Sequence, residues 1–195
     1  MTAFCPYRPP RAEAPGGATR VLLHACCAPC SSAIVECLVE NGIRPTLFYS
    51  NSNIAPVEEY RLRRDECARY ARSWGLEIVE DDYDHAAWQC IARGKEQEPE
   101  RGARCLECFK YRLGRAARYA AAEGYPVLAT TLAASRWKDL AQVDAAGRYA
   151  CSLFPGVTWW AQNWRKDGLQ ERRGQIIREQ AFYNQPYCGC EYSFR

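Results

Sequence analysis

The sequence predicts an α/β fold in which a parallel β-sheet is flanked by helices. Two patterns carry this prediction. Short apolar runs, which are typical of buried strands, recur along the chain, and longer segments with helical periodicity separate them. Strands that alternate with helices form βαβ units, and their right-handed crossovers produce parallel sheets. Because ligands of such sheets bind beyond the carboxyl ends of the strands, we expect the functional side chains there.

The first strand–helix units begin directly after a proline-rich start. Val21–Ala25 is a continuous apolar run that predicts a buried strand. A helix is expected to follow to about residue 40, with Pro29 in its first turn, where the missing N–H costs little. Residues 46–50 predict the second strand. Residues 57–74 predict a long helix, because apolar side chains fall on one stripe and arginines on the other.

The rest of the chain continues the alternation and closes with an irregular segment. Further strands are predicted at 76–80, 127–131 and 157–161, and further helices at 84–93, 105–123, near 137–150 and near 168–182. Residues 184–195 lack regular periodicity and predict a cysteine-containing C-terminal tail. Residues 1–19 predict a loosely ordered leader. We therefore expect residues 20–195 to form a single α/β domain.

Composition restricts the function mainly through cysteine. The formal net charge of +3 neither indicates nor excludes a nucleic-acid partner. The N-terminus has no apolar core of a secretory signal, and no run of about 18 apolar residues could span a membrane. We therefore predict a cytoplasmic protein with no membrane partner. Its 12 cysteines favour metal binding or catalysis over structural disulfides, because the cytosol is reducing.

Three cysteines lie within five residues in the segment HACCAPCSS, at a predicted strand-to-helix turn. A helix N-terminus favours anions, so it favours the thiolate forms of Cys26, Cys27 and Cys30. Adjacent cysteines do not suit a zinc knuckle, which separates its ligands by two to four residues, whereas a cluster with several irons can use both. Packing of the thiols in the core is the alternative. His24 is either an outer partner of Cys26 or a core histidine.

Two further cysteine pairs accompany this group. Cys105 and Cys108, in RCLECF, have the C-x-x-C spacing of metal and redox sites and could complete the four-thiolate ligand set of a [4Fe–4S] cluster. Cys188 and Cys190, in YCGCEYS, could close a small strained disulfide, a type that is labile or catalytic. They could also be metal ligands or free thiols. We interpret the five isolated cysteines as structural.

Five segments together carry a family resemblance. LLHACCAPCSSAIVECL, FYSNSNIAPVEEYRLR, EPERGARCLECFKYRL, LATTLAASRWK and FYNQPYCGCEYS follow the order and spacing of the cobalamin-independent epoxyqueuosine reductases of the QueH type. The resemblance spans about residues 20–195. It implies a Rossmann-like fold of the adenine nucleotide alpha-hydrolase type. It also implies the reduction of epoxyqueuosine to queuosine in the wobble position of a tRNA anticodon.

The same resemblance implies a set of cofactor positions. It places a [4Fe–4S] cluster on Cys26, Cys27, Cys105 and Cys108, and it makes Cys188 and Cys190 a redox-active pair supplied by an unidentified electron donor. It allows one additional iron or other metal ion beside the cluster, for which Cys30 is a candidate ligand. The chain departs from the family pattern at residues 49–53, which read Tyr-Ser-Asn-Ser-Asn, and where Ser135, Arg136 and Trp137 precede Lys138. These departures affect the substrate loops and leave the ligand positions untouched.

The implied substrate is a base in single-stranded RNA, which proteins recognise by stacking and by hydrogen bonds to its edges. Chemistry on such a base requires it to be splayed into a pocket. The residues expected to bind it are Tyr49, Asn51, Asn53, Tyr60 and Lys138. Further candidates for stacking are Trp137, Trp159, Trp160 and Trp164. Attraction of the RNA backbone is expected from the helix-face arginines Arg61, Arg63, Arg64, Arg69, Arg72, Arg112, Arg115 and Arg118.

Two other functions compete with this reading. The first is a zinc-stabilised RNA-binding module without catalysis, which would contain zinc and no inorganic sulfide. The second is an ATP-dependent RNA-thiolating enzyme of similar architecture. That enzyme would need a glycine-rich phosphate loop after the first strand, whereas this chain has Cys-Cys-Ala-Pro-Cys at residues 26–30.

Overall fold

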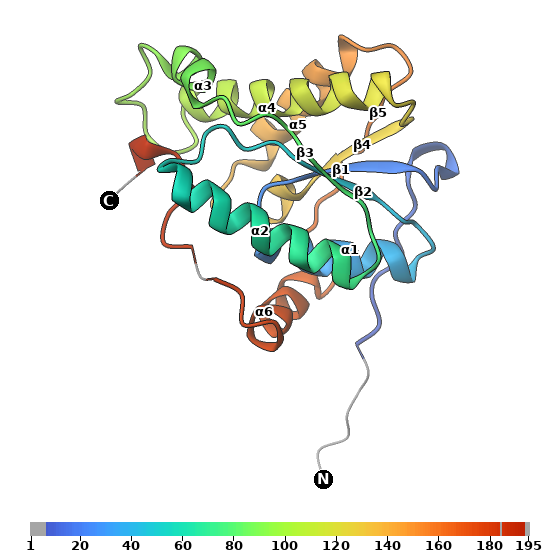
Figure 1. Ribbon diagram of the computed structural model, residues 1–195. Coiled ribbons are helices and arrows are strands. Elements are labelled where there is room, and N and C mark those ends of the chain that lie inside the picture. The colour runs from blue at the N-terminus through green and yellow to red at the C-terminus, as the bar shows by residue number, and fades with distance from the viewer. Residues whose placement is uncertain (1–6, 184, 194–195) are drawn as a thin grey trace.

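Five parallel strands form one sheet in the order β3-β2-β1-β4-β5 (Figure 1). The computed structural model describes residues 7–183 and 185–193. The strands are β1 (Val21–Ala25), β2 (Thr46–Tyr49), β3 (Ile78–Glu80), β4 (Val127–Thr130) and β5 (Thr158–Trp159). The helices are α1 (Ala28–Glu40), α2 (Val57–Ser73), α3 (His85–Ala92), α4 (Ala103–Ala122), α5 (Leu140–Ser152) and α6 (Leu169–Glu179). This arrangement confirms the predicted α/β class.

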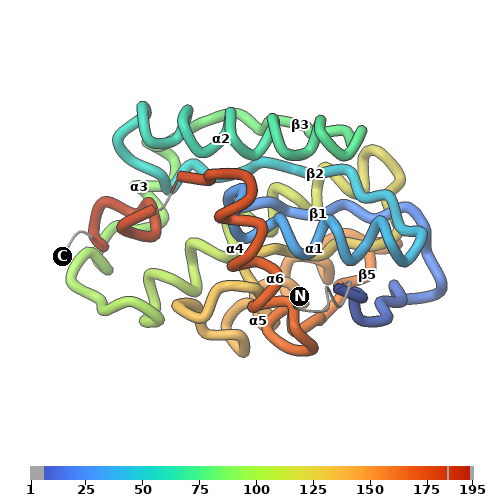
Figure 2. Tube along the Cα trace, turned by 90° about the horizontal axis from the view of Figure 1, so that it is seen from below, coloured from blue at the N-terminus to red at the C-terminus, as the bar shows by residue number. Residues whose placement is uncertain are grey.

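Helices cover both faces of the sheet. Figure 1 shows α1, α2 and α6 below the sheet and α4 and α5 above it. In Figure 2, seen from below, α6 lies across α1, and both lie on the near side of the strands with α2. The central strand β1 is therefore enclosed on both faces, which explains why all five of its residues are buried and why it is apolar throughout.

The two edge strands are shorter than the sequence predicts. Of the predicted strand at 76–80 only Ile78–Glu80 pairs with β2, and of 157–161 only Thr158–Trp159 pairs with β4. Both strands are partly exposed. An edge strand has a neighbour on one side only, so fewer of its residues gain ladder hydrogen bonds.

The strand order reverses between β1 and β4. The chain proceeds from β1 through β2 to β3 on one side, and then returns to place β4 and β5 on the other. Such a reversal opens a crevice at the carboxyl ends of the two strands. Cys26 follows β1 at this point, and a short 3₁₀ helix, η2 (Thr131–Ala134), follows β4.

The described part of the predicted leader packs against α1 in places. Asn41, at the end of α1, accepts a hydrogen bond from the Ala12 amide at 3.1 Å and donates one to the Pro10 carbonyl at 2.9 Å. Ala12 and Ala14 are buried. Residues 1–6 lie outside the described part of the chain. The division into a leader and a domain at residue 20 stays a prediction.

The predicted irregular tail contains one turn of 3₁₀ helix, η3 (Glu191–Ser193), within the described residues 185–193. The segment is held by remote partners. The Gly189 carbonyl accepts from the Ala55 amide at 2.9 Å, and Arg63 donates to the Tyr187 carbonyl at 3.1 Å. These bonds bring Cys188 and Cys190 to the same end of the sheet as Cys26. No helix among the described residues is long and apolar enough to span a membrane.

Candidate functional site

Three thiols meet where β1 passes into α1, two in the turn and the third, Cys30, in the first turn of the helix. The Sγ atoms of Cys26, Cys27 and Cys30 all lie within 4.8 Å of one another, and those of Cys26 and Cys27 are 3.8 Å apart. Cys27 is the N-cap of α1, so the group lies at the helix end that favours negative charge. We call these residues the first thiol group. Soft sulfur donors held this close together suit a thiophilic metal.

The first thiol group contains one acidic thiol and two less acidic ones. Hydrogen bonds from Cys27 and Cys30, assisted by the charge of Arg112 and the Thr131 hydroxyl, hold the pKa of Cys26 well below its ordinary value. The shared hydrogen bonds with Cys26 raise the pKa of Cys27, and they raise that of Cys30 to about 12. Without a metal, a single thiolate on Cys26 is therefore stabilised by its two neighbours.

The two sides of the crevice are joined at Cys26. Its backbone N–H donates to Thr131 Oγ1 at 3.0 Å, and the same hydroxyl donates to Cys26 Sγ at 3.2 Å. Thr131 begins η2, directly after β4. This threonine, which the sequence analysis missed, therefore connects the β4 end to the thiol that follows β1.

His24 is a core histidine. It is fully buried, with Nδ1 2.8 Å from Thr130 Oγ1 and Nε2 3.1 Å from the Ser50 carbonyl oxygen. Burial, and then the nearby charge of Arg112, lower its pKa to about 3. A neutral imidazole thus links the ends of β1, β2 and β4.

Arg112 of α4 is buried close enough to the first thiol group for its charge to lower the pKa of Cys26. Its Nε donates to the Ser50 carbonyl at 3.2 Å, and its Nη2 donates to Asn51 Oδ1. Asn51 in turn donates through Nδ2 to the Ala25 carbonyl at 2.9 Å. Because both polar ends of the Asn51 amide have protein partners, this residue fixes the loop after β2 against β1.

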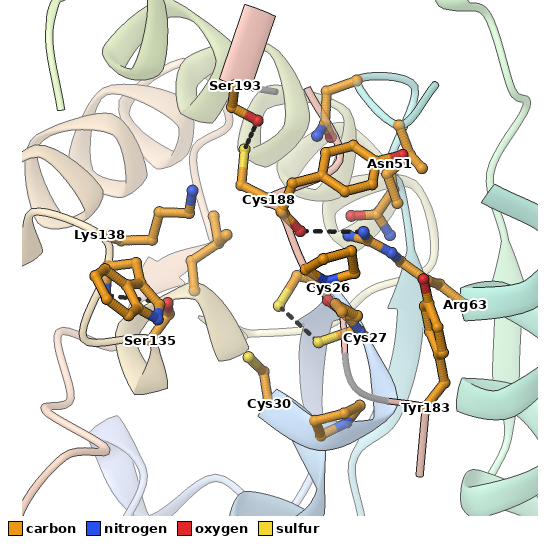
Figure 3. Close-up of a pocket in the computed structure, with 18 of the residues that line it drawn as sticks. Cys26, Cys27, Cys30, Asn51, Arg63, Ser135, Lys138, Tyr183, Cys188 and Ser193 are labelled. Carbon is orange, nitrogen blue, oxygen red and sulfur yellow. Dashed lines mark hydrogen bonds between the residues drawn. The ribbon is translucent and has the colours of Figure 1, made fainter. Parts of the chain in front are cut away.

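A cavity of about 430 Å³ opens beside the first thiol group. In Figure 3, Ser135 and Lys138 lie on one side of the cysteines, Arg63 and Tyr183 lie on the opposite side, and Cys188 faces them from above. The cationic side chains in its wall are Arg63, Arg112, Lys138 and Arg173. This excess of positive charge suits an anionic ligand such as a nucleic-acid strand.

The second cysteine set borders a smaller cavity of about 20 Å³. Its wall contains Cys105 and Cys108 of α4 together with Cys188 and Cys190 of the tail. We call these four residues the second thiol group. The two cavities share the four lining residues Asn53, Arg112, Lys138 and Cys188. Cys105 and Cys108 are not part of the cluster of Sγ atoms within 4.8 Å that the first thiol group forms among the described residues.

Cys188 and Cys190 are free thiols of unequal acidity. A hydrogen bond from Cys190, helped by Lys138 and Ser193, holds the pKa of Cys188 well below its ordinary value, whereas the pKa of Cys190 is raised by the same bond. The Cys188 Sγ lies 3.3 Å from Ser193 Oγ. A thiolate and a thiol side by side are the reactive form of a dithiol.

Gly189, between these two cysteines, is required by its surroundings. Its φ is +102°, and an added Cβ would lie 2.8 Å from Ile54 Cγ1 and 3.1 Å from Arg63 Nη1. A side chain would therefore push the pair away from the loop at Ile54. The sequence motif C-G-C thus reflects close backbone packing.

Lys138 carries the only ammonium group that borders both cavities among the described residues. Burial opposes its charge, but Cys188, Cys105 and Glu100 outweigh burial and raise its pKa. The side chain therefore stays protonated beside the sulfurs. Its expected contact with a substrate stays a prediction.

Asn53 has an unsatisfied acceptor. The residue is 2% exposed, it borders both cavities, and its Oδ1 has no hydrogen-bond partner among the described residues. An unpaired buried carbonyl oxygen costs about 1–3 kcal/mol. A ligand with an N–H or O–H group would relieve that cost.

Tyr49 and Tyr60 do not line either cavity. Tyr49 is fully buried in β2, and its ring packs against that of Tyr60 at a centroid distance of 5.4 Å. We therefore leave Tyr49 and Tyr60 out of the proposed substrate-binding residues. Trp159, Trp160 and Trp164 also lie outside the cavity walls, whereas Trp137 lies in the wall of the larger one.

Two of the helix-face arginines expected to attract the RNA backbone are instead buried parts of the site. Arg63 is 2% exposed and donates to Glu59 at 2.6 Å, one turn earlier in α2. Arg112 is 4% exposed. Arg173 of α6, which the sequence analysis did not consider, donates to the Pro29 carbonyl at 3.0 Å. The i,i+4 spacing of Glu59 and Arg63 could have predicted their ion pair from the sequence. The partners of Arg112 and Arg173 are remote in sequence, so no local pattern predicts them.

Comparison with known proteins adds an independent observation. The family model described as epoxyqueuosine reductase QueH matches residues 21–195. The chain is 43% identical over 190 residues to the epoxyqueuosine reductase QueH of Histophilus somni, covering 97% of this chain and 78% of that protein. It is 42% identical to the protein of the same name from Haemophilus influenzae, with the same coverage. The Acinetobacter baylyi protein is 43% identical over 93% of this chain and 83% of its own length.

Proposed function

Because the chain belongs to the epoxyqueuosine reductase QueH family, an oxidoreductase family, we propose that it reduces epoxyqueuosine to queuosine in the wobble position of a tRNA anticodon. One structural observation supports this activity above others. Two adjoining cavities, with four lining residues in common, bring seven thiols, an ammonium group and an unpaired amide oxygen to the carboxyl ends of the strands. This set offers reducing equivalents, a proton donor and a recognition group.

The proposed reaction consumes two electrons and two protons. Both C–O bonds of the epoxide break, a C=C bond forms between the two carbons, and the oxygen leaves as water. Oxidation of the Cys188 thiolate and the Cys190 thiol to a disulfide releases two electrons and one proton, and the protonated Lys138 can supply the second proton, so the two half-reactions balance. An external reductant must then restore the dithiol. The acidic Cys188 next to a protonated Cys190 supports this role.

The thiol groups fit a metal cofactor in donor chemistry. The first thiol group gathers three soft donors, one of them with a lowered pKa. We propose that Cys26, Cys27, Cys105 and Cys108 hold a [4Fe–4S] cluster and that Cys30 serves an additional iron or other metal ion. When bound, such a cofactor supplies single-electron transfer and a Lewis acid.

Lys138 and Asn53 are the proposed substrate contacts. Of the four cations in the wall of the larger cavity, three are arginines, which do not give up a proton in proteins. Lys138 can hydrogen-bond the oxygen that leaves and can supply its proton. Asn53 can accept from the edge of the base or from the sugar through its free Oδ1. Asn51 is assigned to holding the loop.

The partner is a tRNA whose wobble nucleotide is splayed out of its stack into the larger cavity. The cationic wall would attract its backbone, so binding should weaken as salt rises. Equal affinity at low and moderate salt would contradict this part of the proposal.

Anaerobic reconstitution with iron and sulfide, followed by metal and sulfide analysis and a reduction assay on epoxyqueuosine-containing tRNA, tests the proposal. Bound iron with sulfide and formation of queuosine are expected. One zinc, no sulfide and no product would instead favour the zinc-stabilised RNA-binding module.

A pair of cysteine variants tests the electron supply. Cys188→Ser should abolish turnover and keep the visible absorbance of the reconstituted protein. Cys90→Ser, an exposed cysteine outside both cavity walls, is the matched control and should behave as wild type. Normal turnover of Cys188→Ser would contradict the dithiol role.

A further inference from the structure

Trp137 is largely exposed to solvent, although burying its indole would stabilise the fold. Its side chain is 68% exposed, while Trp88, Trp160 and Trp164 are all buried. An indole has one of the largest apolar surfaces of any side chain, and burial would normally be favourable. Among the described residues, the other exposed large hydrophobic side chains are Leu62, Tyr149 and Leu153, and none of them lines either cavity. Trp137 lines the larger one.

The backbone that carries this indole is fixed from two sides. Arg101 donates to the Trp137 carbonyl at 3.2 Å and to the Arg136 carbonyl at 3.0 Å. Arg165 donates to the Lys138 carbonyl at 2.9 Å and to the Ala133 carbonyl at 3.1 Å. The loop is therefore held in place before any ligand arrives, which lowers the ordering cost of binding.

Arg101 is itself held in place. Gln142 of α5 donates to the Arg101 carbonyl at 2.6 Å, and the Arg101 amide donates to Cys105 Sγ at 3.3 Å. Its φ of +69° is unusual for a residue with a side chain. Arg101 is kept in this conformation, and its guanidinium donates to two carbonyls of the 136–137 segment. We infer that the position of this loop is important for its role at the cavity.

The surroundings of Trp137 select the class of ligand. An exposed aromatic face beside a cation-lined groove is the combination by which proteins bind single-stranded nucleic acid, with bases on the aromatic ring and phosphates on the cations. Lys138 follows Trp137 in sequence, and Arg173 and Arg63 lie in the wall of the same cavity. A base that is splayed out for chemistry leaves the face of its neighbour unstacked, and an indole at the cavity can replace the lost stacking.

We propose that Trp137 is a stacking platform for the base next to the splayed wobble nucleotide, an inference that rests on the proposed function. The indole takes no part in the reduction. It strengthens binding of the anticodon strand by stacking on the face of the flanking base. Because every base has such a face, any base is accepted at that position.

Binding of an anticodon stem-loop RNA with unmodified guanosine at the wobble position tests this. Trp137→Ala should bind about five- to a hundredfold more weakly than wild type, while Trp137→Phe, which keeps an aromatic face, should stay close to it. Tyr149→Ala is the matched control, since Tyr149 is 50% exposed but lines neither cavity, and it should bind as wild type. The dependence of affinity on salt should be unchanged in Trp137→Ala, because no charge is removed.

Abasic substitution identifies the stacked base. In wild type, an abasic site at one flanking nucleotide should weaken binding as much as Trp137→Ala does, and that abasic site should have little further effect in Trp137→Ala. Equal binding of wild type and Trp137→Ala, or full additivity of the two changes, would overturn the inference while leaving the proposed reduction intact. If the wild-type protein bound no stem-loop and reduced no tRNA, the proposed function would fail and this inference with it.

Discussion

The Thr131 hydroxyl is both acceptor and donor to Cys26, with 3.0 Å to the Cys26 N and 3.2 Å to its Sγ. One side chain therefore fixes the backbone and the sulfur of the same residue. It does so from the far side of the crevice, since Thr131 follows β4 and Cys26 follows β1. This hydroxyl orients a proposed metal ligand.

Thr131→Val should weaken metal binding by the first thiol group about tenfold to a hundredfold, the usual effect of removing an outer partner of a ligand. Valine keeps the shape and loses the hydrogen bonds. Competition between the metal-free protein and a coloured chelator for cobalt(II) measures the affinity. Thr131→Ser restores the hydroxyl and should return most of it; a valine variant with wild-type affinity would show that the hydroxyl is not needed.

Gly189→Ala should destabilise the protein more than Gly156→Ala. Both residues have a positive φ, of +102° and +96°, so both substitutions strain the backbone similarly. Only at Gly189 does the new Cβ meet a neighbour, Ile54 Cγ1 at 2.8 Å, whereas nothing lies within 4 Å at Gly156. The extra loss of unfolding free energy should be about 1–3 kcal/mol, measured by urea titration.

The cause of that difference can be checked with Ile54→Ala. This substitution removes the clashing Cγ1, so Gly189→Ala should cost less in the Ile54→Ala background than alone. Full additivity of the two changes would count against the close approach of the Gly189 backbone to Ile54.

Two helical glycines should respond to alanine in opposite directions. Gly114 in α4 has free space around it, so Gly114→Ala should stabilise the protein by about 0.5–1 kcal/mol through better helix propensity. At Gly147 in α5 a Cβ would lie 2.2 Å from Trp159 Cε2, so Gly147→Ala should destabilise by about 1–3 kcal/mol or more. Thermal unfolding of both variants measures the change in stability of each relative to wild type. A change in the same direction for both would contradict the packing described for the two glycines.

Asp81 should stabilise the fold in a pH-dependent way. Burial alone would raise the pKa of this carboxyl, but hydrogen bonds from Arg115 and Ser50 outweigh burial and lower it. A lowered pKa gives stability that is fully present above the unfolded value of about 3.9 and is lost as pH falls through the folded value. Asp81→Asn should therefore cost about 1–3 kcal/mol at neutral pH and lose less stability below about pH 4.

The neighbouring Glu80 supplies the control for Asp81. Its side chain is 43% exposed and its carboxylate lies 3.6 Å from the Arg64 guanidinium, so Glu80→Gln should change stability by less than about 1 kcal/mol. Urea unfolding at several pH values compares the two. Equal slopes of stability against pH in wild type and Asp81→Asn would contradict the assignment.

Asn53→Leu should raise the KM for epoxyqueuosine-containing tRNA more than it lowers kcat. The Oδ1 of Asn53 is buried and unpaired, and we propose that it accepts from the substrate in the ground state as well as later. A lost hydrogen bond of about 1 kcal/mol predicts roughly a fivefold effect. A change confined to kcat would place Asn53 in a different role.

The central part of the fold was readable from sequence because its signals are local. β1 is an uninterrupted apolar run, and Pro29 begins the following helix as expected. The first thiol group lies within five residues, so its proximity needs only one turn. The second thiol group instead joins cysteines of α4 to cysteines of the tail that lie 80 to 85 positions later, and such a meeting depends on the whole topology.

Burial of charge was the main feature that the sequence could not provide. Arg63 lies on α2, whose other arginines are at least partly exposed, and Arg112 lies on α4, where Arg104 is also buried but Arg115 and Arg118 are not, so periodicity does not distinguish the buried arginines. The buried guanidinium of Arg112 is stabilised by two hydrogen-bond acceptors, the Ser50 carbonyl and Asn51 Oδ1, which lie about 60 positions away in sequence. For Tyr49 and Tyr60, one motif shared with Asn51 and Asn53 predicts a substrate contact, whereas the structure packs the two rings against each other and outside both cavity walls.

Because the strand order reverses between β1 and β4, the residues that stabilise the fold are largely distinct from the connections that border the thiols. Two short connections, the 26–27 turn and η2, border that crevice, while the sheet and its outer helices provide the bulk of the core. Changes such as Gly147→Ala in α5, a helix that lines neither cavity, can therefore alter the stability of the scaffold without altering the residues around the thiols. Conversely, new chemistry could arise by replacing those connections on an unchanged frame.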